Sequence, residues 1–199
     1  MSVSLDGYIS AEGVSPEEPM GDGGEKLHEW AFGDDELNQQ LLEEGVKFQG
    51  AVIAGRSTYD NSVEWWGADG PTGPVCNPVF VVTHEPPADA PANGVYTFVT
   101  EGIERALDQA KSAADGKNVV IMGGADLGRQ FLNADLIDEI SIHLVPVLFG
   151  GGTRLFEPFD GNHVNLETES VIETPQSIHL RFDVGDQSNE GDGESERTP

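Results

Sequence analysis

The sequence of 199 residues carries 36 Asp and Glu side chains against 10 Lys and Arg side chains, which gives a formal net charge of −26. A surface of that sign repels phosphate backbones and anionic lipid headgroups, which excludes nucleic-acid binding and polybasic docking to membranes. Apolar residues make up 37% of the chain and come in dense runs, so we expect one folded domain rather than a disordered chain.

The acidic residues are spread over nearly the whole chain, and Lys is scarce. We interpret this pattern as adaptation to high salt, where the screening length falls to about 3 Å at 1 M, with an ordinary acidic protein as the alternative. The lone Cys76 excludes an intrachain disulfide, and no apolar run approaches the roughly 18 residues that span a bilayer. No basic and then hydrophobic leader opens the sequence, so we expect a cytoplasmic protein.

The first third of the chain alternates strand patterns with helix patterns. Residues 1–10 begin as a strand that breaks at an Asp-Gly turn, and a loop rich in Gly, Pro and Glu follows. An N-cap near Asp34 and a stop at Gly45 bound a helix with leucines on one face. Residues 49–56 form a buried strand, and a helix over 57–66 follows, capped by its first two residues. The leucines that would face the core are Leu37, Leu41 and Leu42.

The middle of the chain combines continuous apolar runs with segments of helical spacing. The runs cover residues 78–83, 94–99 and 118–122, and helices open near Thr100 and after Gly124. Strands separated by helices in this way imply βαβ crossovers and a largely parallel sheet.

The last third changes to alternating patterns. One alternating run covers residues 140–145, and two more, over 164–173 and 177–184, flank a Thr-Pro-Gln turn. This arrangement predicts a C-terminal antiparallel hairpin. Residues 186–199 hold nothing apolar and predict a solvated tail.

Two places share the order apolar strand, glycine, helix start: residues 51–58 and 119–128. Free amide N–H groups and the positive end of the helix dipole meet at such a junction, and in the first of them Ser and Thr hydroxyls and Arg56 add donors for phosphate. Glycines that serve only tight turns are the alternative for either place alone, but two such places in one sheet favour a bound dinucleotide. Ala125 stands where a Rossmann fingerprint needs glycine, and neither turn continues as a P-loop.

No pattern in the sequence supports metal-dependent or hydrolytic chemistry. The His residues are far apart without the spacing of metal ligands, and His143 and His179 lie in alternating strands, where hydrogen-bonded side chains are expected. No Gly-x-Ser-x-Gly elbow is present, and no motif marks Cys76 as a nucleophile. We therefore expect no bound metal and no hydrolase.

Three motifs stand in a fixed order along the chain: Ser4-Leu-Asp-Gly-Tyr-Ile-Ser10, Gly55-Arg-Ser-Thr-Tyr59, and a long block from Met122-Gly-Gly-Ala-Asp-Leu127 to Gly150-Gly-Gly-Thr-Arg-Leu-Phe156. Together they resemble the dihydrofolate reductase-like superfamily, and within it the branch of the reductase domain of the bacterial riboflavin deaminase-reductase, over residues 1–184. The resemblance implies an α/β fold whose central, mostly parallel sheet is flanked by helices and ends in the antiparallel hairpin. It also implies NADPH as hydride donor. The resemblance ends at residue 184, and from composition we expect a disordered acidic tail at 185–199.

The resemblance assigns cofactor contacts to both glycine turns and to two further positions. Thr83, with His84, would lie near the 2′-phosphate, and Ile9 would touch the nicotinamide end. The residues that would hold the pyrophosphate and the adenosine side are Gly55, Arg56, Ser57 and Thr58. The residues that would pack under the pyrophosphate, with a cis peptide between the two glycines, are Gly123, Gly124, Ala125 and Leu127.

On the substrate side the sequence departs from the patterns of the relatives. Several residues that relatives carry before Ser4 are missing, so either the first strand is short or the true start lies upstream. The stretch that begins at Asp60 lacks the Asp-x-Pro-x-Leu segment, and the basic residue beyond it, with which riboflavin-pathway reductases bind the ribose phosphate. Trp30 followed by Asp35 fits the substrate side of a folate reductase, but Gln39 stands where those enzymes carry an aromatic residue.

We therefore expect an NADPH-dependent reductase similar to 5-amino-6-(5-phosphoribosylamino)uracil reductase, which passes a hydride to a C=N or C=O bond of a small heterocycle or sugar-derived substrate. Asp6 or Asp35, or water, would act as the polarising acid, and helix capping is the simpler role for Asp35. Dihydrofolate reductase proper and a non-catalytic NADP(H)-binding module are the alternatives. An exposed sheet edge at the C-terminal hairpin would permit a homodimer.

Overall fold

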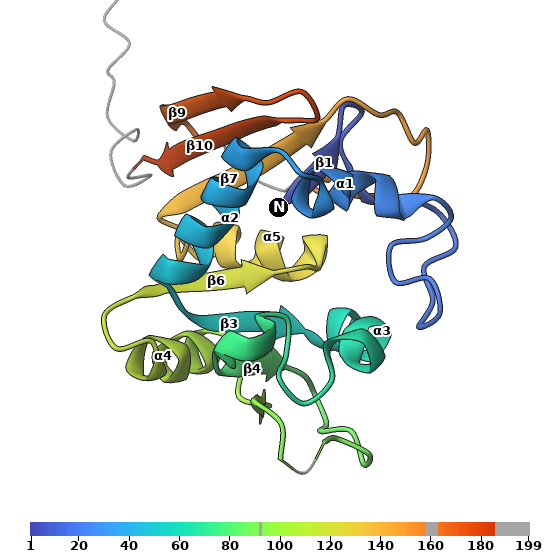
Figure 1. The fold of residues 1–199 in the computed structure, drawn as a ribbon. Helices are drawn as coiled ribbons and strands as arrows, with labels where there is room; N and C mark the ends of the chain where they lie inside the picture. The colour runs from blue at the N-terminus through green and yellow to red at the C-terminus, as the bar shows by residue number, and fades with distance from the viewer. Residues whose placement is uncertain (92, 158–162, 186–199) are drawn as a thin grey trace, which may run out of the picture.

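A computed structural model describes residues 1–91, 93–157 and 163–185, so the predicted acidic tail lies, apart from its first residue, outside the described residues (Figure 1). The strands are β1 (Ser2–Ser4), β2 (Tyr8–Ser10), β3 (Gln49–Gly55), β4 (Val79–Val82), β5 (Tyr96–Val99), β6 (Asn118–Met122), β7 (Glu139–Val145), β8 (Thr153–Arg154), β9 (Leu166–Glu173) and β10 (Ile178–Val184). The helices are α1 (Glu29–Phe32), α2 (Glu36–Phe48), α3 (Arg56–Trp66), α4 (Ile103–Ala113) and α5 (Ala125–Asn133), with 3₁₀ turns at Gly24–His28 and Gly73–Val75.

The strands form two main sheets and one short pair. One sheet has the order β5-β4-β3-β6, and all its strands are parallel, with Ala54 opposite both Val81 and Met122. The other has the order β1-β7-β10-β9, with β1 parallel to β7 and the rest antiparallel. The short pair joins β2 to β8. The predicted fold class is confirmed: parallel strands with crossover helices come first, and the antiparallel hairpin β9–β10 comes last.

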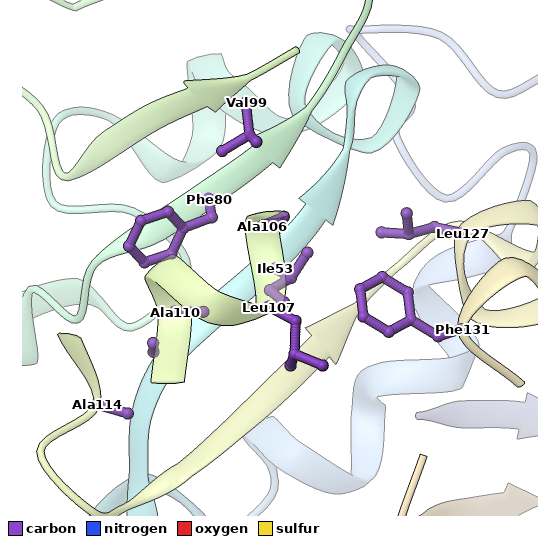
Figure 2. Close-up of a cluster of buried hydrophobic side chains, with 10 residues drawn as sticks. Ile53, Phe80, Val99, Ala106, Leu107, Ala110, Ala114, Leu127 and Phe131 are labelled. Atoms are coloured by element: carbon purple, nitrogen blue, oxygen red, sulfur yellow. The ribbon is translucent and has the colours of Figure 1, made fainter. Parts of the chain in front are cut away.

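The main hydrophobic core lies between the parallel sheet and the two helices α4 and α5 (Figure 2). Ile53 and Phe80 come from the sheet, Leu107 from α4 and Phe131 from α5, and all four side chains are buried. Burial of one such side chain contributes about 1.5–3 kcal/mol to folding. This core fixes the positions of β3, β6 and α5, from which the candidate site is built.

Several predicted element ends are wrong by a few residues, and the backbone explains why. Asp35 caps α2, because its carboxylate accepts a hydrogen bond from the Asn38 N–H at 3.0 Å, and α2 runs past Gly45 to Phe48. Helix α3 begins at Arg56 with Gly55 as its N-cap, so its Ser-Thr pair lies inside the first turn and caps nothing.

Two further corrections concern α4 and the early loop. Gly102, with a φ of 102°, is the N-cap of α4 in place of Thr100. The loop expected up to about Lys26 ends in a 3₁₀ turn, and the short helix α1, which no pattern predicts, follows it; the two bury Leu27 and Trp30. None of the helices that the structure describes is both long and apolar enough to cross a bilayer.

Candidate functional site

The two glycine turns lie side by side at one edge of the parallel sheet. Because β3 and β6 are neighbouring parallel strands, the helices that follow them, α3 and α5, both begin at the carboxyl edge of this sheet (Figure 1). The N-caps are Gly55 and Gly124, and neither has a side chain that caps the helix. Both helix N-termini therefore offer backbone N–H groups to a ligand, as anion sites do.

Thr58 packs directly on the second turn and joins it to the first. A Cβ atom added to Gly123 would lie 2.5 Å from Thr58 Cγ2 and 2.8 Å from Thr58 Oγ1, and one added to Gly124 would lie 3.4 Å from the same hydroxyl oxygen. Both glycines have positive φ, 66° and 72°, a backbone region that other residues rarely adopt. The peptide between them is trans, so the expected cis bond is wrong: the two left-handed residues turn the chain without it.

Arg56 links the first turn to the end of the neighbouring strand β4. Its Nε donates to the Asp60 carboxylate at 2.7 Å, and its Nη1 donates to the Glu85 carbonyl at 2.7 Å and to Thr83 Oγ1 at 3.5 Å. The side chain of Arg56 remains 37% exposed. Three elements thus bring a guanidinium, a hydroxyl and two free helix N-termini to one edge of the sheet, and that combination suits a phosphorylated ligand.

A cavity of about 630 Å³ adjoins the second turn. Gly123, Gly124 and Ala125 line one part of it, and Thr153 of β8 lines it as well. The residues that line the cavity do not include those of the first turn, which lies outside it. Leu127 is buried beneath both turns, with its Cβ 3.8 Å from the position that a Cβ on Gly55 would take.

Ile9 lies in β2, which pairs with β8 next to this cavity. Its side chain is only 8% exposed. Arg154 of β8 stacks on the neighbouring Tyr8 ring at 4.6 Å and donates to the Tyr8 hydroxyl at 3.1 Å. Arg154 also donates to the Asp6 carbonyl at 3.2 Å. Sequence reasoning missed this contribution of Arg154, although its Gly-Gly-Gly-Thr-Arg motif had been singled out as part of the resemblance.

Asp6 anchors the loop that follows β7. Its carboxylate accepts hydrogen bonds from Ser4 Oγ at 2.6 Å, from the Phe149 N–H at 3.2 Å and from the Gly150 N–H at 2.8 Å. The hydrogen bond from Ser4, together with the two backbone N–H groups, lowers the pKa of Asp6 to about 2. These hydrogen bonds hold the carboxylate against the loop after β7, and the role of Asp6 as polarising acid stays a prediction.

Trp30 and Asp35 lie apart from the glycine turns, and neither lines the cavity. The Trp30 side chain is 3% exposed, its Nε1 donates to Ser2 Oγ at 3.0 Å, and its ring lies 4.4 Å from that of His143. Trp30 is therefore packed inside the protein, and its contact with a substrate stays a prediction. Asp35 is partly exposed and caps α2.

His143 and His179 form a buried polar network. The sequence predicts that these side chains are hydrogen-bonded, but not that they contact each other. Their Nδ1 atoms lie 2.8 Å apart, and His179 Nε2 lies 2.9 Å from both Ser177 Oγ and Asn38 Oδ1. The predicted hydrogen bonding of these side chains is confirmed. Burial lowers the pKa of His143 to about 2, so this imidazole is neutral at physiological pH. Within the described ranges, no group of three or more His, Cys, Asp or Glu side chains could hold a metal ion.

The chain has recognisable relatives in sequence and in structure. Residues 1–180 match the family described as the RibD C-terminal domain. The uncharacterized protein YwjB of Bacillus subtilis (strain 168) is 32% identical over 139 residues, which are 66% of this chain and 71% of YwjB. A candidate riboflavin biosynthesis protein from Shewanella sp. PV-4 has a TM-score of 0.69 and 19% identity, with 92% of this chain and 96% of that chain covered.

Two further solved structures share the fold at lower TM-scores. Dihydrofolate reductase from Enterococcus faecalis, complexed with NADP(H) and RAB-propyl, has a TM-score of 0.57 and 16% identity, with 92% of this chain and 93% of that chain covered. Acinetobacter baumannii RibD, form 2, has a TM-score of 0.59 and 18% identity, with 93% of this chain but only 56% of RibD covered. The chain thus spans little more than half of that protein. At these identities the structures establish a dihydrofolate reductase-like fold.

Proposed function

The chain belongs to the RibD C-terminal domain family, and from that premise we propose that it is an NADPH-dependent reductase of the riboflavin-biosynthesis type. The observation that carries the proposal is the pair of glycine turns: two helix N-termini without capping side chains, joined by Thr58, with Arg56 held beside Thr83. In a chain of net charge −26, a guanidinium at the carboxyl edge of a parallel sheet is the expected partner of a phosphorylated dinucleotide.

The residues present fit that cofactor. Thr58 fills the space that a side chain on Gly123 would need, so this position requires glycine, and a pyrophosphate would approach backbone that carries no side chain. Arg56 and Thr83 offer donors for the 2′-phosphate or the pyrophosphate at the end of β4. Ile9 would contact the nicotinamide end from β2. When bound, NADPH supplies the hydride.

The protein's own residues would orient the reactants and hold the surrounding loops. Asp6 holds the loop after β7 through hydrogen bonds from Phe149 and Gly150, and Arg154 holds the chain at Tyr8, so both sides of the β2–β8 pair are tied to the rest of the protein. Such preorganisation contributes to rate by holding a reactive geometry. Because the Asp6 carboxylate holds the loop after β7 and the Asp35 carboxylate caps α2, we propose that water supplies the proton.

For the substrate we propose a phosphoribosylamino-pyrimidine or a close analogue in preference to a folate, with its ribose phosphate bound by residues other than the absent Asp-x-Pro-x-Leu segment. The neighbour from Thermotoga maritima is a deaminase and 5-amino-6-(5-phosphoribosylamino)uracil reductase, which has a TM-score of 0.59 at 14% identity. Two observations speak against folate: Trp30 is sealed in the interior, and the exposed Gln39 donates to the Gly33 carbonyl at 3.2 Å where folate enzymes carry an aromatic residue.

The test is NADPH oxidation, followed at 340 nm in high KCl, with 5-amino-6-(5-phosphoribosylamino)uracil and with dihydrofolate as substrates. The proposal predicts turnover with the pyrimidine and none with dihydrofolate. Saturable NADPH binding without oxidation of either would favour a non-catalytic NADP(H)-binding module. Absence of NADPH binding would reject both functions.

A further inference from the structure

The first turn of α3 makes contacts on both sides of β3. Strands β4 and β6 lie on opposite sides of β3 (Figure 1). On the β6 side, Thr58 packs against Gly123. On the β4 side, Arg56 donates to the Glu85 carbonyl and to Thr83 Oγ1. The site therefore offers anions two separate places, which suits a dinucleotide that carries a further phosphate besides its pyrophosphate.

Helix stability does not account for the ion pair of Arg56 with Asp60. Arg56 is the first residue of α3, where a cation lies at the positive end of the helix dipole and destabilises the helix. Asp60 follows four residues later, and a cation placed before the acid is the weaker orientation of such a pair. The two side chains are 37% and 45% exposed, so water and salt screen their attraction. The pair therefore indicates a role in the site.

Asp60 occupies half of the guanidinium edge that best binds a phosphate. The Nε of Arg56 donates to Asp60 Oδ1 at 2.7 Å, and its Nη1 donates to the turn after β4. Among the described residues, no hydrogen bond engages its Nη2. Nε and Nη2 share one edge of the guanidinium, from which two parallel N–H groups can bind two oxygens of a phosphate. A phosphate that takes both therefore has to displace the Asp60 carboxylate.

The turn after β4 uses its own donors internally. The Thr83 hydroxyl donates to the Glu85 carbonyl at 2.8 Å, and the Glu85 N–H donates back to Thr83 Oγ1 at 3.3 Å. Because a hydroxyl has a single hydrogen, Thr83 in this arrangement offers Arg56 only its lone pairs. Arg56 is therefore the main donor for an anion at the end of β4, and competition for its Nε–Nη2 edge decides how strongly that anion binds.

We infer that Asp60 sets how strongly the site discriminates between NADPH and NADH, an inference that rests on the proposed function. Its carboxylate holds the Nε–Nη2 edge of Arg56, and the 2′-phosphate of NADPH displaces it from that edge. NADH has no 2′-phosphate and leaves the ion pair in place. Asp60 is thus an internal competitor of the cofactor, and the affinity for NADPH is lower than Arg56 alone would give.

The charges explain why a phosphate displaces Asp60 and chloride does not. A phosphate monoester carries a charge of about −1.5 to −2 at pH 7 and has three oxygens, whereas the carboxylate carries a single charge. Chloride also carries one charge and has no second atom for the guanidinium edge. Because Asp60 is tethered to the same helix as Arg56, chloride competes with a partner of high effective concentration. The ion pair therefore reserves Arg56 for phosphate in a medium rich in chloride.

The first test is isothermal titration calorimetry with NADPH and with NADH, on the unmodified protein and on Asp60→Asn in high KCl. The substitution removes the charge of the competitor and keeps its shape. We expect the dissociation constant of NADPH to fall about three- to tenfold, because both the ion pair and the repulsion between phosphate and carboxylate are lost. The dissociation constant of NADH should change by less than about twofold, because exposed charges farther away are screened.

Two further variants separate competition from net charge. Glu64→Gln removes the same charge one turn further along α3, at an exposed position, and should change neither dissociation constant. In the Arg56→Ala background, Asp60→Asn should leave NADPH binding unchanged, because the contested guanidinium is gone. Equal or weaker NADPH binding by Asp60→Asn would overturn the inference, and so would a gain that Glu64→Gln or the Arg56→Ala background reproduces.

The second test uses no cofactor and follows the Nε–H group of Arg56 by NMR. This group should exchange slowly with water in the unmodified protein and in Glu64→Gln, and at least about fivefold faster in Asp60→Asn, because the hydrogen bond to Asp60 protects it. Equal exchange in the three proteins would overturn the inference, whatever NADPH does. If none of the proteins bound NADPH, the proposed function would fall as well, whereas NADPH binding that is indifferent to Asp60 would remove this inference alone.

Discussion

Substitution of Gly123 by alanine tests the glycine turn on which the cofactor site depends. Gly123 has a φ of 66°, and an alanine Cβ there would lie 2.5 Å from Thr58 Cγ2. The left-handed backbone disfavours alanine by about 1–2 kcal/mol. Overpacking against Thr58 adds about 1–3 kcal/mol. A combined loss of about 3 kcal/mol lowers the melting temperature of a chain of this size by roughly 6–12 °C.

The assay is thermal unfolding in high KCl together with an NADPH fluorescence titration. Gly123→Ala should lower the melting temperature by that amount and weaken NADPH binding at least tenfold, because relief of the overlap moves Thr58 or the turn. A second substitution, Thr58→Ala, removes the crowding atoms and should restore the part of the stability lost to overpacking, while the backbone strain remains.

Gly128 provides the matched control. It lies in α5, about one helical turn after the glycine pair, and a Cβ added there would meet no atom within 4 Å. Gly128→Ala should therefore raise stability by up to about 1 kcal/mol through helix propensity and leave NADPH binding unchanged. If Gly123→Ala behaved like Gly128→Ala in both assays, the geometry assigned to the turn would be refuted.

Three further predictions follow from the charges. Arg56→Ala should change the free energy of unfolding by less than about 1 kcal/mol, because its ion pair with Asp60 is exposed. It should weaken NADPH binding roughly 10- to 100-fold, because charge-assisted hydrogen bonds to the cofactor are lost. The control is Arg105→Ala, on the exposed side of α4: a similar loss of binding there would point to net charge alone. The pKa of His143 is near 6.5 in the unfolded chain and about 2 in the folded protein. Below pH 6.5 the unfolded chain therefore binds a proton that the folded protein does not. The free energy of unfolding should fall as the pH drops below 6.5, by up to about 1.4 kcal/mol per pH unit. Urea midpoints at pH 7.5, 6.0 and 5.0 measure that slope, and His143→Leu should flatten it; an unchanged slope would contradict the assignment. Finally, a net charge of −26 predicts that the melting temperature rises with KCl, and an equal melting temperature in dilute buffer would reject adaptation to salt.

Local patterns sufficed to predict most of the scaffold. The apolar runs that became β3, β4 and β6, and the alternating runs that became β7, β9 and β10, were found within a few residues of their ends. The two glycine turns were also predictable, because a strand that ends in glycine before a helix is a local feature. Strands β3 and β6 are neighbours in the parallel sheet, so the proximity of Gly55 to the Gly123 turn could be predicted from the sequence.

Contacts between segments far apart in the sequence could not be predicted from local patterns. Asp6 was one of the candidates for the polarising acid, with Asp35 and water, but no local pattern shows that its carboxylate binds Phe149 and Gly150, which lie more than 140 residues away along the chain. Trp30 was expected to face a substrate, but a short helix that the loop-like sequence did not reveal turns it into the interior, against His143. Helix caps were misjudged for a different reason: Asp34 and Asp35 are chemically equivalent caps, and only the backbone geometry selects Asp35.

The most direct test of the central claim is a titration of the full chain with NADPH and with NADH in high KCl, followed by energy transfer from the protein's tryptophans to the nicotinamide. The account predicts saturable binding of one NADPH per chain, at least tenfold tighter than NADH, and loss of that preference in Arg56→Ala because this guanidinium lies beside Thr83. Equal affinity for the two dinucleotides, or binding unaffected by both Arg56→Ala and Gly123→Ala, would contradict it.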